Sequence, residues 1–195
     1  MRPEAVRGFT LSAGSGLAAL IGGLLWIVKS LSILIADKQP DFTFEVAPFF
    51  FALATLGVVS IWEPTRTRPS RNVRRLTLFA AVVGGVATIA YVVGGDEGLV
   101  GPALAATVLI VVAVLGYTGR DIRRSHALGA LGALPFALAL LFVLAIPVGA
   151  VLENLNERLL EIPLLGIGIG WVVLSSAATE FTPLKWRVSS TESPS

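Results

Sequence analysis

The chain has no cysteine, and its only histidine is His126. Without cysteine there are no disulfides, no thiolate nucleophiles and no cysteine-ligated metal sites. A single histidine is too few for a histidine-rich metal centre or for a haem held by two histidines. We therefore expect neither a metal site nor a cofactor.

Charged side chains are also scarce. They make up 14% of the 195 residues, whereas hydrophobic residues make up 54%. A soluble globular domain has about 25% charged residues. This composition favours a protein that is embedded in a lipid bilayer.

Six long apolar segments are present instead. They run from Thr10 to Ala36, Val46 to Trp62, Leu76 to Val93, Leu99 to Tyr117, Ala127 to Leu152, and Ile162 to Phe181. An α-helix needs about 20 apolar residues to cross about 30 Å of hydrocarbon, and the alternation typical of a β-barrel is missing. The sequence predicts an all-α polytopic membrane protein. We expect a single domain, residues 1–195, whose bundle of six transmembrane helices forms three consecutive hairpins.

The basic residues between these segments predict the orientation. Twelve Lys and Arg residues lie in the two termini and in the second and fourth loops, whereas the outer loops hold only Lys38 and Arg158. Basic residues concentrate on the cytoplasmic side of membrane proteins. The short N-terminus (about residues 1–9) and the tail (about residues 183–195) are therefore predicted to be cytoplasmic. The expected location is a prokaryotic inner or plasma membrane.

The same charge asymmetry bears on partners. A basic inner surface attracts anionic lipid headgroups by about 1 kcal/mol per residue. Membrane topology already accounts for these residues, so we expect no nucleic-acid partner. The lipid bilayer is the expected environment, and a second copy of the chain or another membrane protein is a candidate partner.

Lys29 is the one ionisable residue well inside the first apolar segment. At helical spacing it shares a face with Gly22 and Trp26 and is flanked by Ser30, whereas bulky aliphatic residues occupy the opposite face. Small residues allow helices to approach closely, so this face is predicted to contact protein. The ring of Trp26 is a candidate partner for the ammonium group.

Two interpretations of Lys29 remain open. It lies about 10 Å before Ala36 along a helix axis, within reach of the outer interface for an extended lysine side chain. One interpretation is a paired structural lysine, with Glu45 or Glu153 as candidate partners. The other is a lysine that binds an ion or substrate, because intramembrane charges often mark functional sites.

An acidic loop follows the fifth apolar segment. Glu153, Glu157 and Glu161 recur at every fourth position. Like charges at this spacing disfavour one another. We predict a solvated outer turn rather than a cation site, because no EF-hand spacing is present.

The last two segments contain further candidates. Pro135 and Pro147 interrupt the fifth segment, where prolines are predicted to break helical hydrogen bonding. Broken helices expose backbone groups to ligands in transporters, but proline kinks are also common in membrane helices. In the sixth segment, Gly166 and Gly170 have the spacing of a close helix-packing motif.

A polar cluster ends the sixth segment. Ser176 and Glu180 lie one helical turn apart and share a face. Pairing of Glu180 with nearby arginines is the main interpretation, and a proton relay is the alternative.

One short motif bears on catalysis. Ala13-Gly14-Ser15-Gly16 resembles the serine motif of rhomboid proteases, which also have six helices. In that family, however, the serine and the histidine lie in later helices. Here His126 is in a predicted cytoplasmic loop, and a nucleophilic serine needs its base within hydrogen-bond reach.

Three function classes follow in order of preference. The first is a non-catalytic membrane subunit that associates with itself or with a partner. The second is a small ion or solute transporter or channel that uses Lys29 and the outer carboxylates. The third is an intramembrane enzyme, which we do not expect because no other catalytic motif occurs.

Overall fold

The computed structural model describes residues 11–38, 40–62, 71–94, 98–125 and 130–176. These residues form helices and no strand. The helices are α1 (Ala13–Ala36), α2 (Thr43–Trp62), α3 (Arg71–Gly94), α4 (Val100–Ser125), η2 (Ala130–Ala133), α5 (Leu134–Glu153), η3 (Glu157–Leu160) and α6 (Glu161–Ser175). His126 and Glu180 lie outside the described residues.

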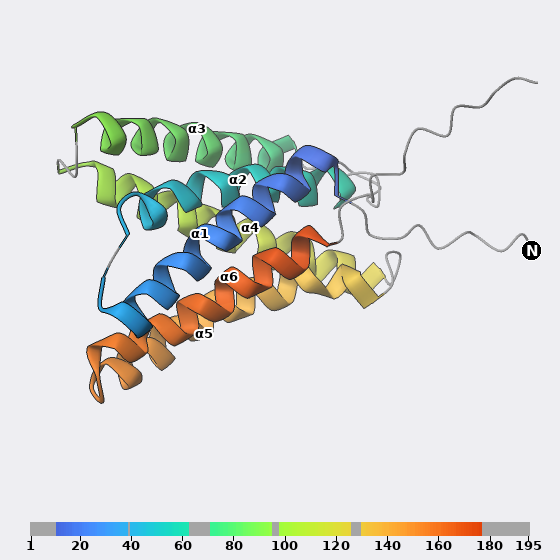
Figure 1. Cartoon of the computed structure of the whole chain (residues 1–195). Helices are drawn as coiled ribbons and strands as arrows, with labels where there is room; N and C mark the ends of the chain where they lie inside the picture. Colours follow the sequence, from blue (N-terminus) through green and yellow to red (C-terminus); the bar gives the residue numbers. More distant parts are fainter. Residues whose placement is uncertain (1–10, 39, 63–70, 95–97, 126–129, 177–195) are drawn as a thin grey trace, which may run out of the picture.

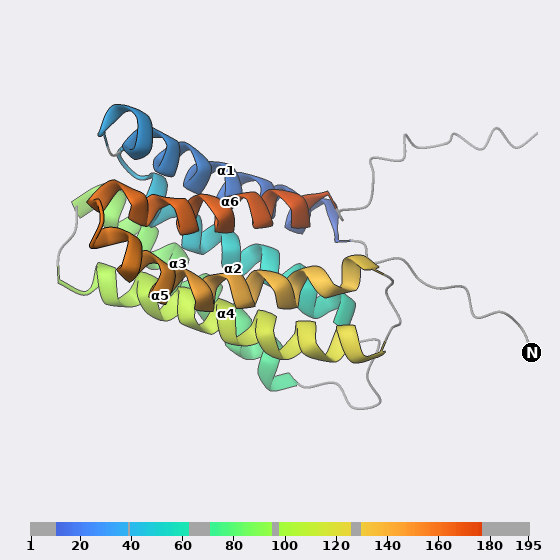
Figure 2. The same cartoon turned by 90° about the horizontal axis from the view of Figure 1, so that it is seen from below.

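The described residues form 6 helices that are long and apolar enough to cross a membrane. This confirms the prediction of an all-α chain with six spans, as expected for a multi-pass membrane protein. The helices run alongside one another as a bundle in two perpendicular views (Figures 1 and 2). The N-terminal end of α1 and the C-terminal end of α6 lie at the same end of the bundle (Figure 1). We call this the inner end and the opposite one the outer end.

Each α-helix packs against the next one in sequence, and α1 also packs against α6. The helix α2 contacts α1, α3 and α4, so it lies in the middle of the bundle. Half of the residues in its apolar 18-residue stretch are buried inside the bundle. Large side chains from α2 and α6 fill the core, where the rings of Phe51 and Trp171 stack with their centroids 4.7 Å apart.

Several helices extend beyond their apolar segments. The helix α3 begins at Arg71, before the predicted Leu76, and α4 continues to Ser125, beyond the predicted Tyr117. Both extensions are rich in arginine. A helix satisfies its own backbone hydrogen bonds, so it can continue out of the apolar layer with polar side chains.

Two prolines lie elsewhere in their helices than predicted. Pro135 was expected to break the fifth helix, but α5 begins at Leu134 and Pro135 lies in its first turn. The missing N–H has no intrahelical partner there, so this proline starts the helix instead of breaking it. The predicted segment Val46 to Trp62 would place Pro48 near a helix start, but α2 begins five residues before this proline, at Thr43, so Pro48 lies inside the helix. Pro147 lies inside α5, as predicted.

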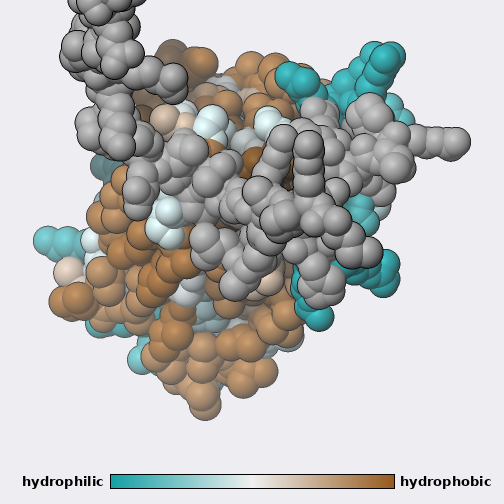
Figure 3. Space-filling model, turned by 90° about the vertical axis from the view of Figure 1, so that its right-hand side faces the viewer, coloured by the Kyte–Doolittle hydropathy of each residue, from teal (hydrophilic) through white to brown (hydrophobic). Residues whose placement is uncertain are grey.

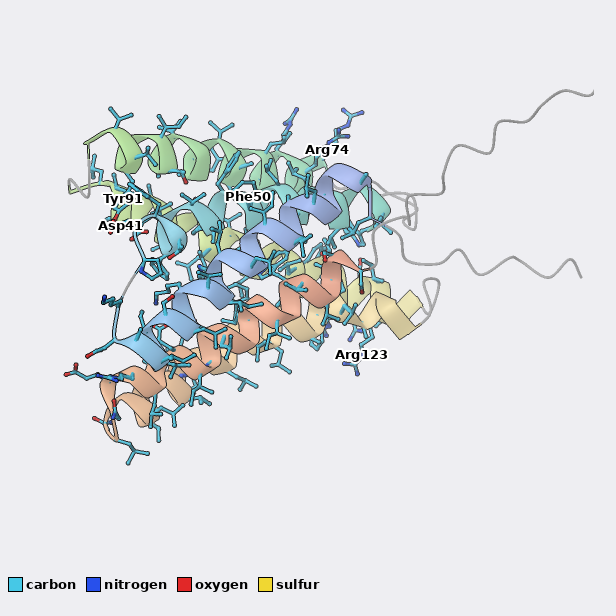
Figure 4. All side chains as sticks on the ribbon, in the orientation of Figure 1. Asp41, Phe50, Arg74, Tyr91 and Arg123 are labelled. Atoms are coloured by element: carbon cyan, nitrogen blue, oxygen red, sulfur yellow. The ribbon has the colours of Figure 1, made fainter. Side chains whose placement is uncertain are left out.

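Charge separates along the bundle. Arg74 and Arg123 lie toward the inner end, whereas Asp41 lies at the outer end near Tyr91 (Figure 4). From the inner end, apolar side chains cover the flanks and hydrophilic groups project at the rim (Figure 3). The described part of the protein therefore has a polar inner end, apolar flanks and an acidic outer end.

Candidate functional site

Lys29 is paired with Glu161 inside the outer half of the bundle. The Nζ atom of Lys29 lies 2.6 Å from Oε1 of Glu161, and their side chains are 8% and 6% exposed. The hydroxyl of Ser30 donates to the other carboxylate oxygen, Oε2, at 3.0 Å. Two donors from α1 thus hold one carboxylate from α6, and we call these three residues the α1–α6 clasp.

Local features of each helix place these groups. Glu161 is the first residue of α6, where the positive end of the helix dipole stabilises a carboxylate. The ring of Phe44, near the start of α2, lies 4.9 Å from Nζ of Lys29. That distance is within the range of a cation–π contact. The ammonium group therefore has both a counter-ion and an aromatic neighbour.

The close approach of α1 and α6 brings the clasp together. A Cβ atom on Gly23 would lie 2.7 Å from the carbonyl oxygen of Gly168, closer than such atoms normally come. A Cβ atom on Gly168 would likewise lie 2.9 Å from the carbonyl oxygen of Gly23. Only residues without a side chain allow two helices to approach so closely.

The partner of Lys29 differs from the candidates Glu45 and Glu153. Sequence reasoning placed Glu161 in a solvated loop, but the structure buries it at the head of α6. One signal could have found it: an acid two residues before a proline, as in Glu161-Ile-Pro163, is typical of the first turn of a helix. Glu153 ends α5, and its side chain is outside what the structure describes.

A cavity of about 730 Å³ lies beside the clasp. It is bounded mainly by α4 and α5, and α1, α2, α3 and α6 contribute the remaining wall. Leu109, Val143 and Ile146 line it and are 66%, 54% and 73% exposed. The mouth of this outer cavity therefore opens sideways between α4 and α5, on the apolar flank of the bundle.

A contact at the inner end explains why α4 and α5 part toward the outer end. A Cβ atom on Gly119 would lie 2.4 Å from the backbone nitrogen of Phe136, so the two backbones nearly touch there. Farther out, Leu109 of α4 and Phe142 of α5 line the outer cavity.

Two polar atoms at the outer cavity have no hydrogen-bond partner among the described residues. They are Nε1 of Trp26 and Oε2 of Glu45. Trp26 is 4% exposed, and its ring stacks on Phe44 with centroids 5.6 Å apart. A buried polar group without a partner costs about 1–3 kcal/mol. Both atoms are buried inside the protein, although other atoms of their residues line the cavity.

The other predicted residues do not gather at this site. The hydroxyl of Ser176 donates to the carbonyl oxygen of Val173 at 2.6 Å, a local bond at the end of α6. Ser15 accepts a hydrogen bond of 2.9 Å from the Ser12 hydroxyl, at the start of α1. Within the described ranges, no group of three or more acidic or histidine side chains could hold a metal ion.

The glycines predicted to allow close helix packing differ in how near their neighbouring atoms lie. A Cβ atom on Gly22 would lie 2.8 Å from the ring of Phe51, and one on Gly170 would lie 2.8 Å from Cδ1 of Leu138. At Gly166, by contrast, the nearest atom would be 3.9 Å away. Close packing in α6 thus depends on Gly168 and Gly170, and the sequence motif missed Gly168.

A comparison of the chain with protein-family models, with curated proteins and with solved structures found no match.

Proposed function

We propose that this protein is a multi-pass membrane protein that binds a small membrane-dissolved molecule in the outer cavity, without catalysing a reaction. The supporting observation is the cavity of about 730 Å³ that opens onto the apolar flank. Ligand sites commonly have volumes of about 300–1,000 Å³, mostly apolar walls and a few polar groups. Glu45 and Tyr91 provide such groups among the lining residues.

We also propose the orientation and the environment. Three helical hairpins place both termini in the cytoplasm of a prokaryotic cell membrane, and the inner arginines face anionic headgroups. The support is the excess of Lys and Arg in the inner segments of the sequence. In this orientation the outer cavity lies in the leaflet away from the cytoplasm.

The geometry changes the order of the function classes. The small-residue faces that favoured a self-associating subunit are occupied within one chain, since Gly22 packs on Phe51 and Gly170 on Leu138. Self-association thus loses its packing argument. A transporter that uses Lys29 also loses support, because Glu161 already neutralises that lysine.

The support for a non-catalytic protein comes from the chemistry of the cavity wall. Among the described residues, its lining includes one carboxylate, Glu45, and one phenol, Tyr91, but no histidine, serine or lysine. Nucleophilic or general acid–base catalysis requires a pair of such groups within hydrogen-bond reach, and no hydrogen bond joins the side chains of Glu45 and Tyr91. Binding is the activity that this wall supports.

Tryptophan fluorescence provides a test. We would titrate the protein in lipid nanodiscs with 6,7-dibromododecyl amphiphiles of different headgroups, because bromine quenches a nearby indole. Trp26 lines the cavity. The component of the tryptophan emission that is lost in Trp26→Phe is the emission of Trp26 itself, which we call the Trp26 component. We expect saturable quenching of this component in the wild-type protein.

A matched pair of variants on α5 provides the control. Ala145 lines the cavity, whereas Ala137 is exposed and is not part of the lining. Ala145→Phe should fill the cavity and weaken quenching about tenfold or more, and Ala137→Phe should leave it unchanged. If every probe quenches Ala145→Phe as strongly as the wild-type protein, the proposal is wrong.

A further inference from the structure

The outer cavity is elongated along α4. Seven of its lining residues come from one face of that helix: Val100, Gly101, Leu104, Ala105, Val108, Leu109 and Val112. From Val100 to Val112 the axis rises about 18 Å. These seven positions are apolar throughout. A linear apolar chain fits along such a wall better than a compact molecule does.

The polar part of the cavity lies at its outer end. Glu45 is in the first turn of α2, and its backbone carbonyl accepts a hydrogen bond of 3.1 Å from the hydroxyl of Thr88 on α3. This bond anchors the start of α2 against α3. The cavity therefore has a polar head region and an apolar tail region, as expected of a site for an amphiphile.

The charge of this head region is negative. Glu45 has no ion pair within the described ranges, and no lysine or arginine lines the cavity. The ammonium group of Lys29 is neutralised by the carboxylate of Glu161, which lies 2.6 Å away. An unpaired carboxylate at the edge of an apolar cavity attracts a cation and repels an anionic headgroup.

Aromatic and backbone groups add to the attraction for a cation. Tyr91 lines the same end of the cavity as Glu45, and an aromatic face attracts a cation. Pro48 has no N–H, so the carbonyl of Phe44 lacks its usual helical donor and remains an acceptor. An ammonium group, with several N–H donors and a positive charge, complements these groups.

We infer that the outer cavity binds an amphiphilic amine with a single tail. Its protonated nitrogen donates to the carboxylate of Glu45, and its apolar tail lies along α4 toward Val112. This inference rests on the proposed function, because it names the chemistry of the ligand in the same cavity.

The test compares three probes with the same tail: 6,7-dibromododecylammonium, 6,7-dibromododecanol and 6,7-dibromododecanoate. Quenching of the Trp26 component in nanodiscs at neutral pH measures the affinity of each. We expect the ammonium probe to bind about tenfold or more tightly than the alcohol, and the carboxylate to bind least tightly. This comparison uses the wild-type protein, so it stays decisive if a variant fails to fold.

Two acid-to-amide variants separate the cavity carboxylate from the general surface charge. Glu45→Gln should bring the ammonium and alcohol affinities to within about threefold of each other. Asp41→Asn removes an equal charge from an exposed site at the same end. It should leave the preference for the ammonium unchanged.

Each outcome has a separate meaning. If the wild-type protein binds the alcohol as tightly as the ammonium, or if Asp41→Asn abolishes the preference as fully as Glu45→Gln does, the inference is wrong. The proposed function survives those results as long as Ala145→Phe still weakens quenching. If Ala145→Phe weakens quenching by none of the probes, the proposed function fails as well.

Discussion

Gly23 of α1 and Gly168 of α6 face each other across the tightest contact between these two helices. Each would place a Cβ atom within 3 Å of the other's carbonyl oxygen, at 2.7 Å from Gly23 and 2.9 Å from Gly168. The first and last helices of the bundle meet here, about two helical turns from the Lys29–Glu161 pair. The clasp depends on this contact, because a wider separation would take the lysine away from its carboxylate.

We predict that Gly168→Ala is destabilising. The added methyl group would push against the backbone of Gly23 and against Ile27, and overpacking of this kind costs about 1–3 kcal/mol. Thermal unfolding in detergent measures the effect. The matched control is Gly166→Ala on the same helix, where the nearest atom would be 3.9 Å away. Equal losses in both variants would contradict the role of the close contact.

We predict that Lys29→Met lowers the stability by about 3–5 kcal/mol, because it leaves the carboxylate of Glu161 buried without its cation. The double variant Lys29→Met/Glu161→Met should recover much of this loss, since two apolar side chains need no pairing. Unfolding measurements on Lys29→Met, Glu161→Met and the double variant together give the interaction energy of the pair, as in a double-mutant cycle. A double variant less stable than either single one would refute this account of the pair.

An exposed ion pair serves as the reference for the clasp. Arg158 and Asp37 also pair, but their side chains are 45% and 64% exposed. Exposed pairs contribute about 0–1 kcal/mol. Arg158→Ala should therefore change the unfolding temperature far less than Lys29→Met does.

We predict that Ser30→Ala destabilises the clasp by a smaller amount than loss of the lysine. The Ser30 hydroxyl donates to Oε2 of Glu161 at 3.0 Å, and a hydrogen bond to a charged group contributes about 1.5–3 kcal/mol. Ser60→Ala is the control, because that hydroxyl donates to a carbonyl of its own helix, Leu56, at 2.8 Å. Unfolding temperatures that shift equally in the two variants would show that the bond to Glu161 adds nothing.

We predict that the outer end faces away from the cytoplasm. The chain has no cysteine, so a single introduced cysteine gives an unambiguous label. Leu155→Cys, at an exposed outer position, should react with a membrane-impermeant maleimide in intact cells. Asn72→Cys, near the inner start of α3, should react only after permeabilisation. The reverse pattern would overturn the proposed orientation.

Particular elements show how far sequence reasoning reached. The six apolar segments predicted six helices because span length and apolarity are local properties of the chain. The predicted helix ends were less accurate: α3 begins at Arg71 and α4 ends at Ser125, both beyond the apolar segments. A helix continues wherever its backbone hydrogen bonds can form. Lys29 was singled out from its place in an apolar run, but Glu161 was assigned to a solvated loop.

The sequence by itself determined the helical class, the number of spans and the asymmetry of charge, since each follows from composition and spacing along one segment. Only the tertiary structure decided the partner of Lys29 and the presence of the outer cavity. The pair joins residues 132 positions apart, and no local pattern specifies which of several acids will meet a distant lysine. The cavity likewise depends on how α4 and α5 meet at Gly119 and part beyond it. That separation is a property of packed side chains, which act only once the helices are assembled.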